Sequence, residues 1–308
     1  MGTENAIRLT SGQIATLVCQ LEVSAAKPGN VHRSADFEDA TLIDFLNSGV
    51  ALGHAIDASL NEGHAEHPIA VGQMILSAVQ ATAWVTNTNT NLGIILLLCP
   101  LACLHARAEA LNSETIATLL NALTPKDAQD VYAAIAQSGA GGLQMKTDDA
   151  AAQQAYDVRA NDSAPRDLLT AMKIAAERDM IAKQYCTGFK DVFEFVLPAI
   201  EQGLSRFELL SSAIIFAHVK TMAQYPDSLI ARKLGDQAAI QSAGYAQRAI
   251  DQFAQCDKEF TPFWDSVSDL DFWLRSDHHR RNPGTTADLI SAALYVGVAT
   301  DRLKPPFR

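Results

Sequence analysis

The sequence predicts an all-α protein, a single compact domain over residues 1–308 with about a dozen helices and with polar turns clustered at one end. Three observations support this prediction. Alanine and leucine are abundant while aromatic residues make up only 7% of the chain, a balance that favours helix over strand. Apolar residues recur at helical spacing, as at Ile14, Val18 and Leu21. We find no sustained two-residue alternation of the kind that half-buried strands show.

The predicted elements follow in chain order. A first helix covers residues 11–25, and the Pro-Gly turn after it separates it from a second helix from about residue 39 to 60. Pro68 opens a third helix through about residue 83, an allowed position for proline. The turn at 86–93, rich in Asn and Thr, precedes a buried helix at 94–110. Further helices are predicted at 113–123, 126–137, 165–184, 189–202, 206–222, 237–255 and 284–300.

Several common kinds of site are excluded by their missing motifs. The Gly-rich loop at 138–143 lacks the Lys-Ser/Thr that completes a P-loop, and no strand precedes it. The histidines and cysteines do not fall in a zinc-binding pattern. A Gly-x-Ser-x-Gly elbow, which would indicate a serine hydrolase, is absent from the sequence.

Charge and cysteine usage limit the partners. The net charge of −11 and the pI near 5.1 argue against nucleic-acid binding, so an anionic small-molecule substrate would need a locally basic pocket. The five cysteines include no Cys-x-x-Cys pair, which fits a reducing cytoplasm. The most apolar stretch, 94–104, contains a proline and is too short to span a bilayer. We therefore expect a cytoplasmic protein with no membrane partner; its oligomeric state is open, with a homo-oligomer as one option.

The run 281–288 has the features of a helix start that can hold an anion. Pro283 cannot continue a preceding helix, Thr285 or Thr286 can cap the next one, and Asp288 adds a carboxylate to its first turn. Free backbone N–H groups and the positive end of the helix dipole make such a turn a natural phosphate site. An ordinary capped helix after a polar loop is the alternative.

A second turn, at 22–33, carries similar chemistry. Lys27, His32 and Arg33 offer positive or titratable groups, and the Asn30 amide can both donate and accept hydrogen bonds. The alternative is a helix–helix connection with a few surface charges.

Carboxylates beside basic residues recur in or near turns. Asp39 follows Arg33, Asp227 opens the run 227–235, and Asp288 closes the turn described above. A magnesium–polyphosphate site requires such a set, because Mg²⁺ takes oxygen ligands and Arg and Lys bind phosphate oxygens. Each Asp taken alone is better explained as a surface residue or a helix cap, because acidic residues are mostly exposed, so the interpretation depends on the whole set.

Four segments, in order, resemble one family. Residues 26–33 match a Pro-Lys-Pro-Gly-x-Val-(Asp/His)-Arg segment, and 89–93 match in part an Asn-Thr-His-Lys-Gly segment. Residues 227–232 match Asp-(Thr/Ser)-x-x-x-Arg, and 282–289 match Ser-Pro-Gly-Gly-x-Ala-Asp-Leu. On these motifs the chain resembles, over roughly residues 15–300, the triphosphoribosyl-dephospho-CoA synthases, which prepare the prosthetic group of citrate lyase and malonate decarboxylase.

The resemblance implies an all-α transferase that moves the 5-triphosphoribosyl unit of ATP to the ribose 2′-hydroxyl of dephospho-CoA and releases adenine, with ATP as substrate and Mg²⁺ as the expected cofactor. Such a reaction needs a clamp on the triphosphate, a group that orients the hydroxyl, and stabilisation of an oxocarbenium-like centre. We expect the phosphates to be bound by Lys27, Arg33, Arg232 and Arg281, and the sugar to be positioned by Asn89 and Asn91. Catalysis and Mg²⁺ binding are assigned to Asp39, Asp227 and Asp288. Further contacts with the substrate are assigned to Asn30, His32, Lys233, Asn282, Thr285 and Thr286.

The chain also departs from the family pattern. Asn91 and Leu92 stand where the family has His-Lys, and Phe37 stands at the histidine of a Gly-Ala-His-x-Asp-Met segment. Asn282 and Thr285 stand where the family has Ser and Gly, and the family's Arg-Gly-Glu segment has no clean match. These departures indicate a divergent branch, of the kind found in archaea and one-carbon-metabolising bacteria.

The departures keep two further functions open. One is a related phosphoribosyl or nucleotide transfer to another acceptor, for example a pterin-type one-carbon carrier, with ATP or phosphoribosyl diphosphate as donor. The other is a helical protein that binds a nucleotide without catalysis.

Overall fold

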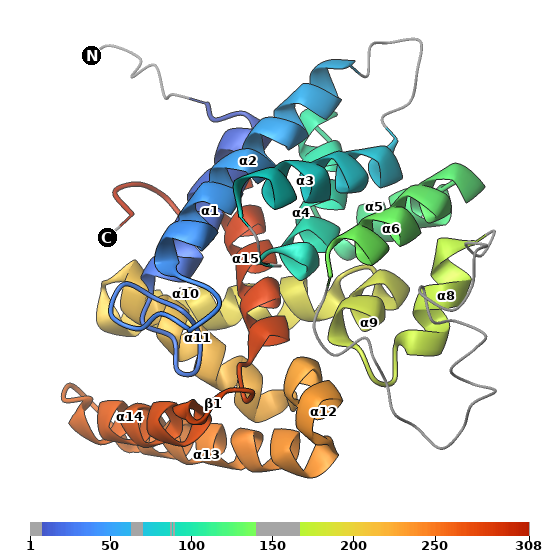
Figure 1. The fold of residues 1–308 in the computed structure, drawn as a ribbon. Coiled ribbons are helices and arrows are strands. Elements are labelled where there is room, and N and C mark those ends of the chain that lie inside the picture. Colours follow the sequence, from blue (N-terminus) through green and yellow to red (C-terminus); the bar gives the residue numbers. More distant parts are fainter. Residues whose placement is uncertain (1–7, 63–69, 87, 89, 140–166, 308) are drawn as a thin grey trace, which may run out of the picture.

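A computed structural model describes residues 8–62, 70–86, 88, 90–139 and 167–307 of the chain. Within these residues it contains 14 α-helices, one π-helical segment and one four-residue strand, which confirms the all-α prediction (Figure 1). The elements are α1 (Ser11–Ser24), α2 (Leu42–Glu62), α3 (Val71–Val85), α4 (Leu92–Ala106), α5 (Ser113–Asn121), α6 (Pro125–Gln137), α8 (Leu168–Ala175), α9 (Met180–Thr187), η1 (Val192–Val196), α10 (Leu197–Phe207), α11 (Leu210–Gln224), α12 (Ser228–Leu234), α13 (Asp236–Gln255), α14 (Thr261–Arg275), β1 (Ser276–His279) and α15 (Gly284–Ala299).

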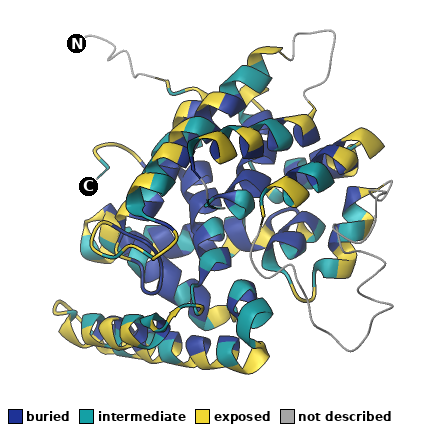
Figure 2. Cartoon of the chain, viewed as in Figure 1, coloured by how far each residue is buried: buried dark blue, intermediate teal, exposed yellow. Residues whose placement is uncertain are grey.

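Helices α4 and α15 form the centre of the fold. The residues from Ile94 to Leu104 of α4 are all buried, and so are most residues of α15 (Figure 2). A helix that is apolar all round is stable only where neighbours cover every face. Here α1, α3, α5, α9, α10 and α11 pack around the two helices, so the N-terminal ends of α4 and α15 are held in fixed positions.

A second apolar cluster lies beneath this centre in Figure 1, where α13 and α14 pack against each other and α13 packs against α11. It is rich in aromatic rings: the centroids of Phe216 and Phe253 are 4.3 Å apart, and those of Phe207 and Phe260 are 4.6 Å apart. Each such pair adds about 1 kcal/mol beyond the area it buries. The cluster fixes α12 and β1, the two elements that bring polar residues towards α15.

The structure corrects several predicted boundaries. The helix predicted at 165–184 is two helices, because Asp179 caps the start of α9 and accepts hydrogen bonds from the N–H groups of Ile181 and Ala182. The segment predicted as a helix at 189–202 is π-helical over η1 before α10 begins. Helices α12 and α14 were not predicted. Pro68, predicted to open the third helix, lies outside the described residues.

The start of α15 also differs from the prediction. The helix begins at Gly284 with Pro283 as the N-cap residue, and no side chain of the turn caps it. Thr285 and Thr286 therefore lie inside the first turn, and Asp288 lies in the second turn and not in the first. In the described part of the chain, no helix is both long and apolar enough to cross a membrane.

Candidate active site

The predicted clustering of polar turns at one end is confirmed by a single large cleft. Its volume is about 1770 Å³, and it lies where the N-terminal ends of α4, α9 and α15 meet α12 and the turns at 22–40 and 279–284. Residues from four sequence-predicted segments line it, among them Asn30, Gly93, Arg232 and Asp288. The cleft thus joins segments that are more than 250 positions apart in the chain.

Asp227 ties two helix starts together beneath this cleft. Its Oδ1 accepts hydrogen bonds from the N–H groups of Leu229 and Ile230 and so caps α12. Its Oδ2 accepts hydrogen bonds of 2.8 Å from both the N–H and the Oγ1 of Thr286 in the first turn of α15. Burial raises the pKa of Asp227, and the hydrogen bonds act in the opposite direction. All of its lone pairs face protein donors, an arrangement that favours a structural role; the catalytic role assigned to Asp227 stays a prediction.

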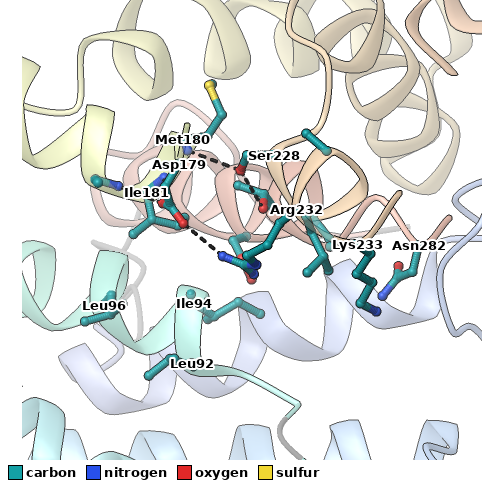
Figure 3. Close-up of a pocket in the computed structure, with 18 of the residues that line it drawn as sticks. Leu92, Ile94, Leu96, Asp179, Met180, Ile181, Ser228, Arg232, Lys233 and Asn282 are labelled. Carbon is teal, nitrogen blue, oxygen red and sulfur yellow. Dashed lines mark hydrogen bonds and ion pairs between the residues drawn. The ribbon is translucent and has the colours of Figure 1, made fainter. Parts of the chain in front are cut away.

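A second tie joins a third helix start to these two. The Met180 N–H at the start of α9 donates to Ser228 Oγ at 3.2 Å, and Ser228 Oγ donates to Thr285 Oγ1 at 3.1 Å (Figure 3). The side chains of Thr285 and Thr286 are therefore engaged with α12, although both residues were predicted to contact substrate. Their hydroxyls hold three helix N-termini around the cleft wall.

Asp288 lies on the cleft wall against α4. A Cβ built on Gly93 would lie 2.0 Å from Asp288 Oδ2, so only glycine at that position leaves room for the carboxylate. Partial withdrawal from water raises the pKa of Asp288 well above its usual range, and the carboxylate of Glu22 adds to the rise. Arg232 opposes it. The Asp288 carboxyl therefore lines the cleft with a raised pKa, and its catalytic role stays a prediction.

Arg232 and Lys233 supply positive charge on the α12 side. Arg232 forms an ion pair of 3.1 Å with Asp179, and its buried Nε has no hydrogen-bond partner. In the described part of the chain Lys233 forms no ion pair or hydrogen bond, and burial lowers its pKa. In the view of Figure 3 the Lys233 ammonium and the Asn282 amide point the same way, and both residues line the cleft. On α12 the cleft therefore has one unpaired cation, Lys233, and one partly paired cation, Arg232.

Lys27 takes a different place from the one predicted. Its side chain has no exposed surface and forms a 2.8 Å ion pair with Glu22, whose side chain is 5% exposed. The Lys27 ammonium also donates to the Glu22 carbonyl at 2.5 Å. Glu22 lines the cleft whereas Lys27 lies behind it, so a role of Lys27 in holding phosphate stays a prediction that this geometry does not favour.

The remaining predicted residues divide into two groups. Asn30 and Asn282 line the cleft, and Asn30 Nδ2 donates to Asn282 Oδ1 at 2.6 Å; Asp39 lines it too, with its carboxylate 3.4 Å from His279 Nε2. The other residues do not line the cleft. Asn91 is buried against Ser48, and Arg281 donates hydrogen bonds to Trp273 O and Ser276 Oγ. His32 is buried, and its pKa is lowered first by burial and second by Arg275; Arg33 is exposed outside the cleft, and Asn89 lies outside the described residues.

Comparison with known proteins gives one match. Over residues 9–306 the chain matches the protein family described as ATP:dephospho-CoA triphosphoribosyl transferase. The chain belongs to this family. It is accordingly an enzyme of the transferase class, as the sequence resemblance predicted. No curated protein and no solved structure matches it.

Among the described residues, no group of three or more His, Cys, Asp or Glu side chains is arranged to hold a metal ion. Asp227 has its oxygens occupied by four protein donors, and the Asp39 side chain is 63% exposed at the rim. The assignment of Mg²⁺ to Asp39, Asp227 and Asp288 therefore stays a prediction, as does the need for Mg²⁺.

Several residues of this transferase site were missed as site residues from sequence. Glu22 was read only as the edge of a turn, and Asp179 fell inside the helix predicted at 165–184. Lys183 lines the cleft, pairs with Asp191 at 2.8 Å, and lies 4.6 Å from the centre of the Tyr225 ring. No local pattern marks these residues, because each depends on a partner from another helix; the one available signal is the helical spacing of Asp179 and Lys183.

Proposed function

We propose that this enzyme transfers the 5-triphosphoribosyl unit of ATP to the ribose 2′-hydroxyl of dephospho-CoA, with release of adenine. The observation that carries the proposal is the family match, which spans residues 9–306 and so includes every wall of the cleft. A cleft of about 1770 Å³ is also large compared with typical small-ligand pockets of about 300–1,000 Å³, as two nucleotide substrates require.

The cations of the cleft support a polyphosphate ligand. Lys233 is an unpaired, partly buried ammonium, and Arg232 has one buried N–H without a partner. A cation withdrawn from water without a counter-charge is costly, and phosphate oxygens would supply that counter-charge. Lys183 adds a third positive group on the same cleft. The three lie on α9 and α12.

Asp288 suits the proton transfer that the reaction needs. In the transfer, the bond between the acceptor 2′-oxygen and C1′ of the ATP ribose forms, and the bond between C1′ and N9 of adenine breaks. The hydroxyl proton passes to the Asp288 carboxylate. The electron pair of the C1′–N9 bond leaves with adenine, which takes up one proton from solvent. A raised pKa brings a carboxylate closer to the working pH, where a general base is most effective. The negative charges of Asp288 and Glu22 also face the positive charge that develops on the ribose ring.

One observation favours the alternative in which the acceptor is not dephospho-CoA. Leu92 lines the cleft where the family pattern has lysine, and Ile94 and Leu96 continue this apolar wall along α4 (Figure 3). A wall that lacks the lysine charge would suit an acceptor that carries fewer phosphates at that point. A pterin-type carrier is one such acceptor.

The experiment is chromatographic detection of free adenine after incubation with ATP, Mg²⁺ and candidate acceptors. We expect adenine release with dephospho-CoA, and a loss of about 100-fold or more in Asp288→Asn. Asp251→Asn, an exposed carboxylate on α13, is the matched control and should keep full activity. Omitting Mg²⁺ and adding a chelator tests the metal dependence.

Adenine release only with another acceptor would contradict the proposal and support the alternative transfer. So would transfer from phosphoribosyl diphosphate, which releases pyrophosphate instead of adenine. Nucleotide binding without turnover on any acceptor would support a binding protein.

A further inference from the structure

Two aromatic rings stack at the rim of the cleft. The centroids of Phe37 and His279 are 5.0 Å apart and their planes differ by 23°. Both residues line the cleft and both keep exposed surface. The carboxylate of Asp39 lies 3.4 Å from His279 Nε2 and holds the imidazole from its edge. A planar ligand entering the cleft therefore meets a preformed aromatic surface.

The stacked pair belongs to one tight arrangement of backbone. The turn after β1 closes when the Asn282 N–H donates to the His279 carbonyl at 3.2 Å. On the other side, the Phe37 N–H donates to the Ala40 carbonyl at 2.8 Å, which fixes the turn that carries the ring. Because one turn holds both His279 and Asn282, the aromatic surface and an amide side chain reach the cleft from the same place.

That amide has a fixed orientation and a free donor. Asn30 Nδ2 donates to Asn282 Oδ1 at 2.6 Å, so the oxygen of Asn282 is directed to Asn30. In the described part of the chain Asn282 Nδ2 has no acceptor, and Oδ1 keeps a second lone pair. Asn30 is itself anchored, because Arg275 donates to its carbonyl at 2.7 Å. Asn282 therefore offers the cleft one donor and one acceptor in a held geometry.

We propose that the Phe37–His279 stack and the Asn282 amide form a subsite for an adenine base. An asparagine amide pairs with adenine in a bidentate manner, accepting from the N6 amino group and donating to a ring nitrogen. An aromatic ring supplies the stacking surface that a base prefers. Lys233 lines the same cleft, where its ammonium can take a phosphate of the same nucleotide.

This subsite rests on the proposed function, because both substrates of the proposed reaction, ATP and dephospho-CoA, carry adenine. The subsite uses residues in which this chain departs from the family pattern, since Phe37 stands at a family histidine and Asn282 at a family serine. We infer that the departures change how the base is held.

The test is calorimetric titration of the full chain with ATP, with inosine triphosphate and with dephospho-CoA, in the absence of a second substrate. Inosine triphosphate keeps the triphosphate and ribose but replaces the N6 amino group by an oxygen. We expect the chain to bind ATP about tenfold more tightly than inosine triphosphate. Asn282→Asp keeps the acceptor for Asn30 and for the N6 amino group but removes the Nδ2 donor to the ring nitrogen, so it should weaken binding of ATP and of inosine triphosphate alike.

The stacking surface is tested by a matched series. Phe37→Leu should weaken binding of adenine nucleotides about tenfold, and Phe37→His should restore it. Phe272→Leu is the control, because its ring is 78% exposed on α14 and does not line the cleft. Far-ultraviolet circular dichroism of each variant confirms that it is folded before titration.

The outcomes separate the two sources of adenine. Weakened binding of ATP alone places the donor base in the subsite, weakened binding of dephospho-CoA alone places the acceptor base there, and either result supports the proposal. Unchanged binding of both nucleotides in folded Phe37→Leu and Asn282→Asp overturns it. If binding depends on these residues but no adenine is released with dephospho-CoA, the subsite stands and the proposed reaction fails.

Discussion

Replacing Asp227 by alanine should destabilise the protein through two helix starts at once. The substitution removes the cap of α12, which is worth about 1 kcal/mol. It also leaves the buried N–H and Oγ1 of Thr286 without their acceptor, at about 1.5 kcal/mol each. Removing a buried carboxylate recovers part of its desolvation cost. We therefore expect a net loss of about 3 kcal/mol in the free energy of unfolding, and a fall of about 6 °C in Tm.

The assay is urea unfolding followed by circular dichroism, with Asp167→Ala as the matched control. Asp167 caps α8 through the Leu169 N–H but is exposed and ties no second helix, so its loss should cost about 1 kcal/mol. A loss in Asp227→Ala no larger than that of the control would refute the reasoning.

The isosteric variant Asp227→Asn separates structure from catalysis. It keeps the Oδ1 acceptor for α12 but places an amide donor against the Thr286 N–H. With a structural role, stability and activity fall together. An unchanged unfolding curve with a more than 100-fold loss of adenine release would instead support the catalytic role assigned from sequence.

Three further predictions follow from the same contacts. Gly93→Ala should reduce transfer activity about 100-fold, because the new Cβ would lie 2.0 Å from Asp288 Oδ2 and displace that carboxylate; steady-state kinetics check this, and full activity would contradict it. The raised pKa of Asp288 means that its folded form holds a proton that the unfolded form releases, so its contribution to stability is present below about pH 4 and is lost as the pH rises through the folded pKa. Urea melts from pH 4.5 to 7.5 should therefore show Asp288→Asn gaining stability relative to the parent as the pH rises, and a constant difference would oppose this. Lys27→Met should cost about 3–5 kcal/mol, since it leaves the Glu22 carboxylate buried alone, and the double variant with Glu22→Leu should recover most of that loss in the same unfolding assay.

Much of the helical framework could be predicted from sequence because its signals are local. The periodic apolar residues of α1, the all-apolar run of α4 and the Pro-Gly start of α15 each specify a helix without reference to the rest of the chain. Helices α12 and α14 were missed because α12 is seven residues long and α14 is interrupted by charged residues, so neither gives a strong periodic signal. The break before α9 was missed because Asp179 looks like any helix-interior acid until its capping bonds are seen.

The site could be predicted only in outline. The turns that meet at the cleft were identified, and Asn30, Arg232, Lys233, Asn282 and Asp288 all line it. Which side chains face the cleft was not predictable, because that depends on partners from other elements. Lys27 forms an ion pair with Glu22 and is buried behind the residues that line the cleft. The Arg281 guanidinium stacks over the Trp273 ring, 4.3 Å from the ring centre.

The sequence by itself determined the all-helical class, the family and the motif at 282–289, since each is written in residues close together in the chain. The tertiary structure alone decided the use of that motif. The start of α15 carries no cap of its own, and its orphan Thr286 N–H is satisfied by Asp227, 59 positions earlier. Such a bond forms only after α12 has packed in place, and it is this packing that leaves Asp288, Lys233 and Asn282 facing one cleft.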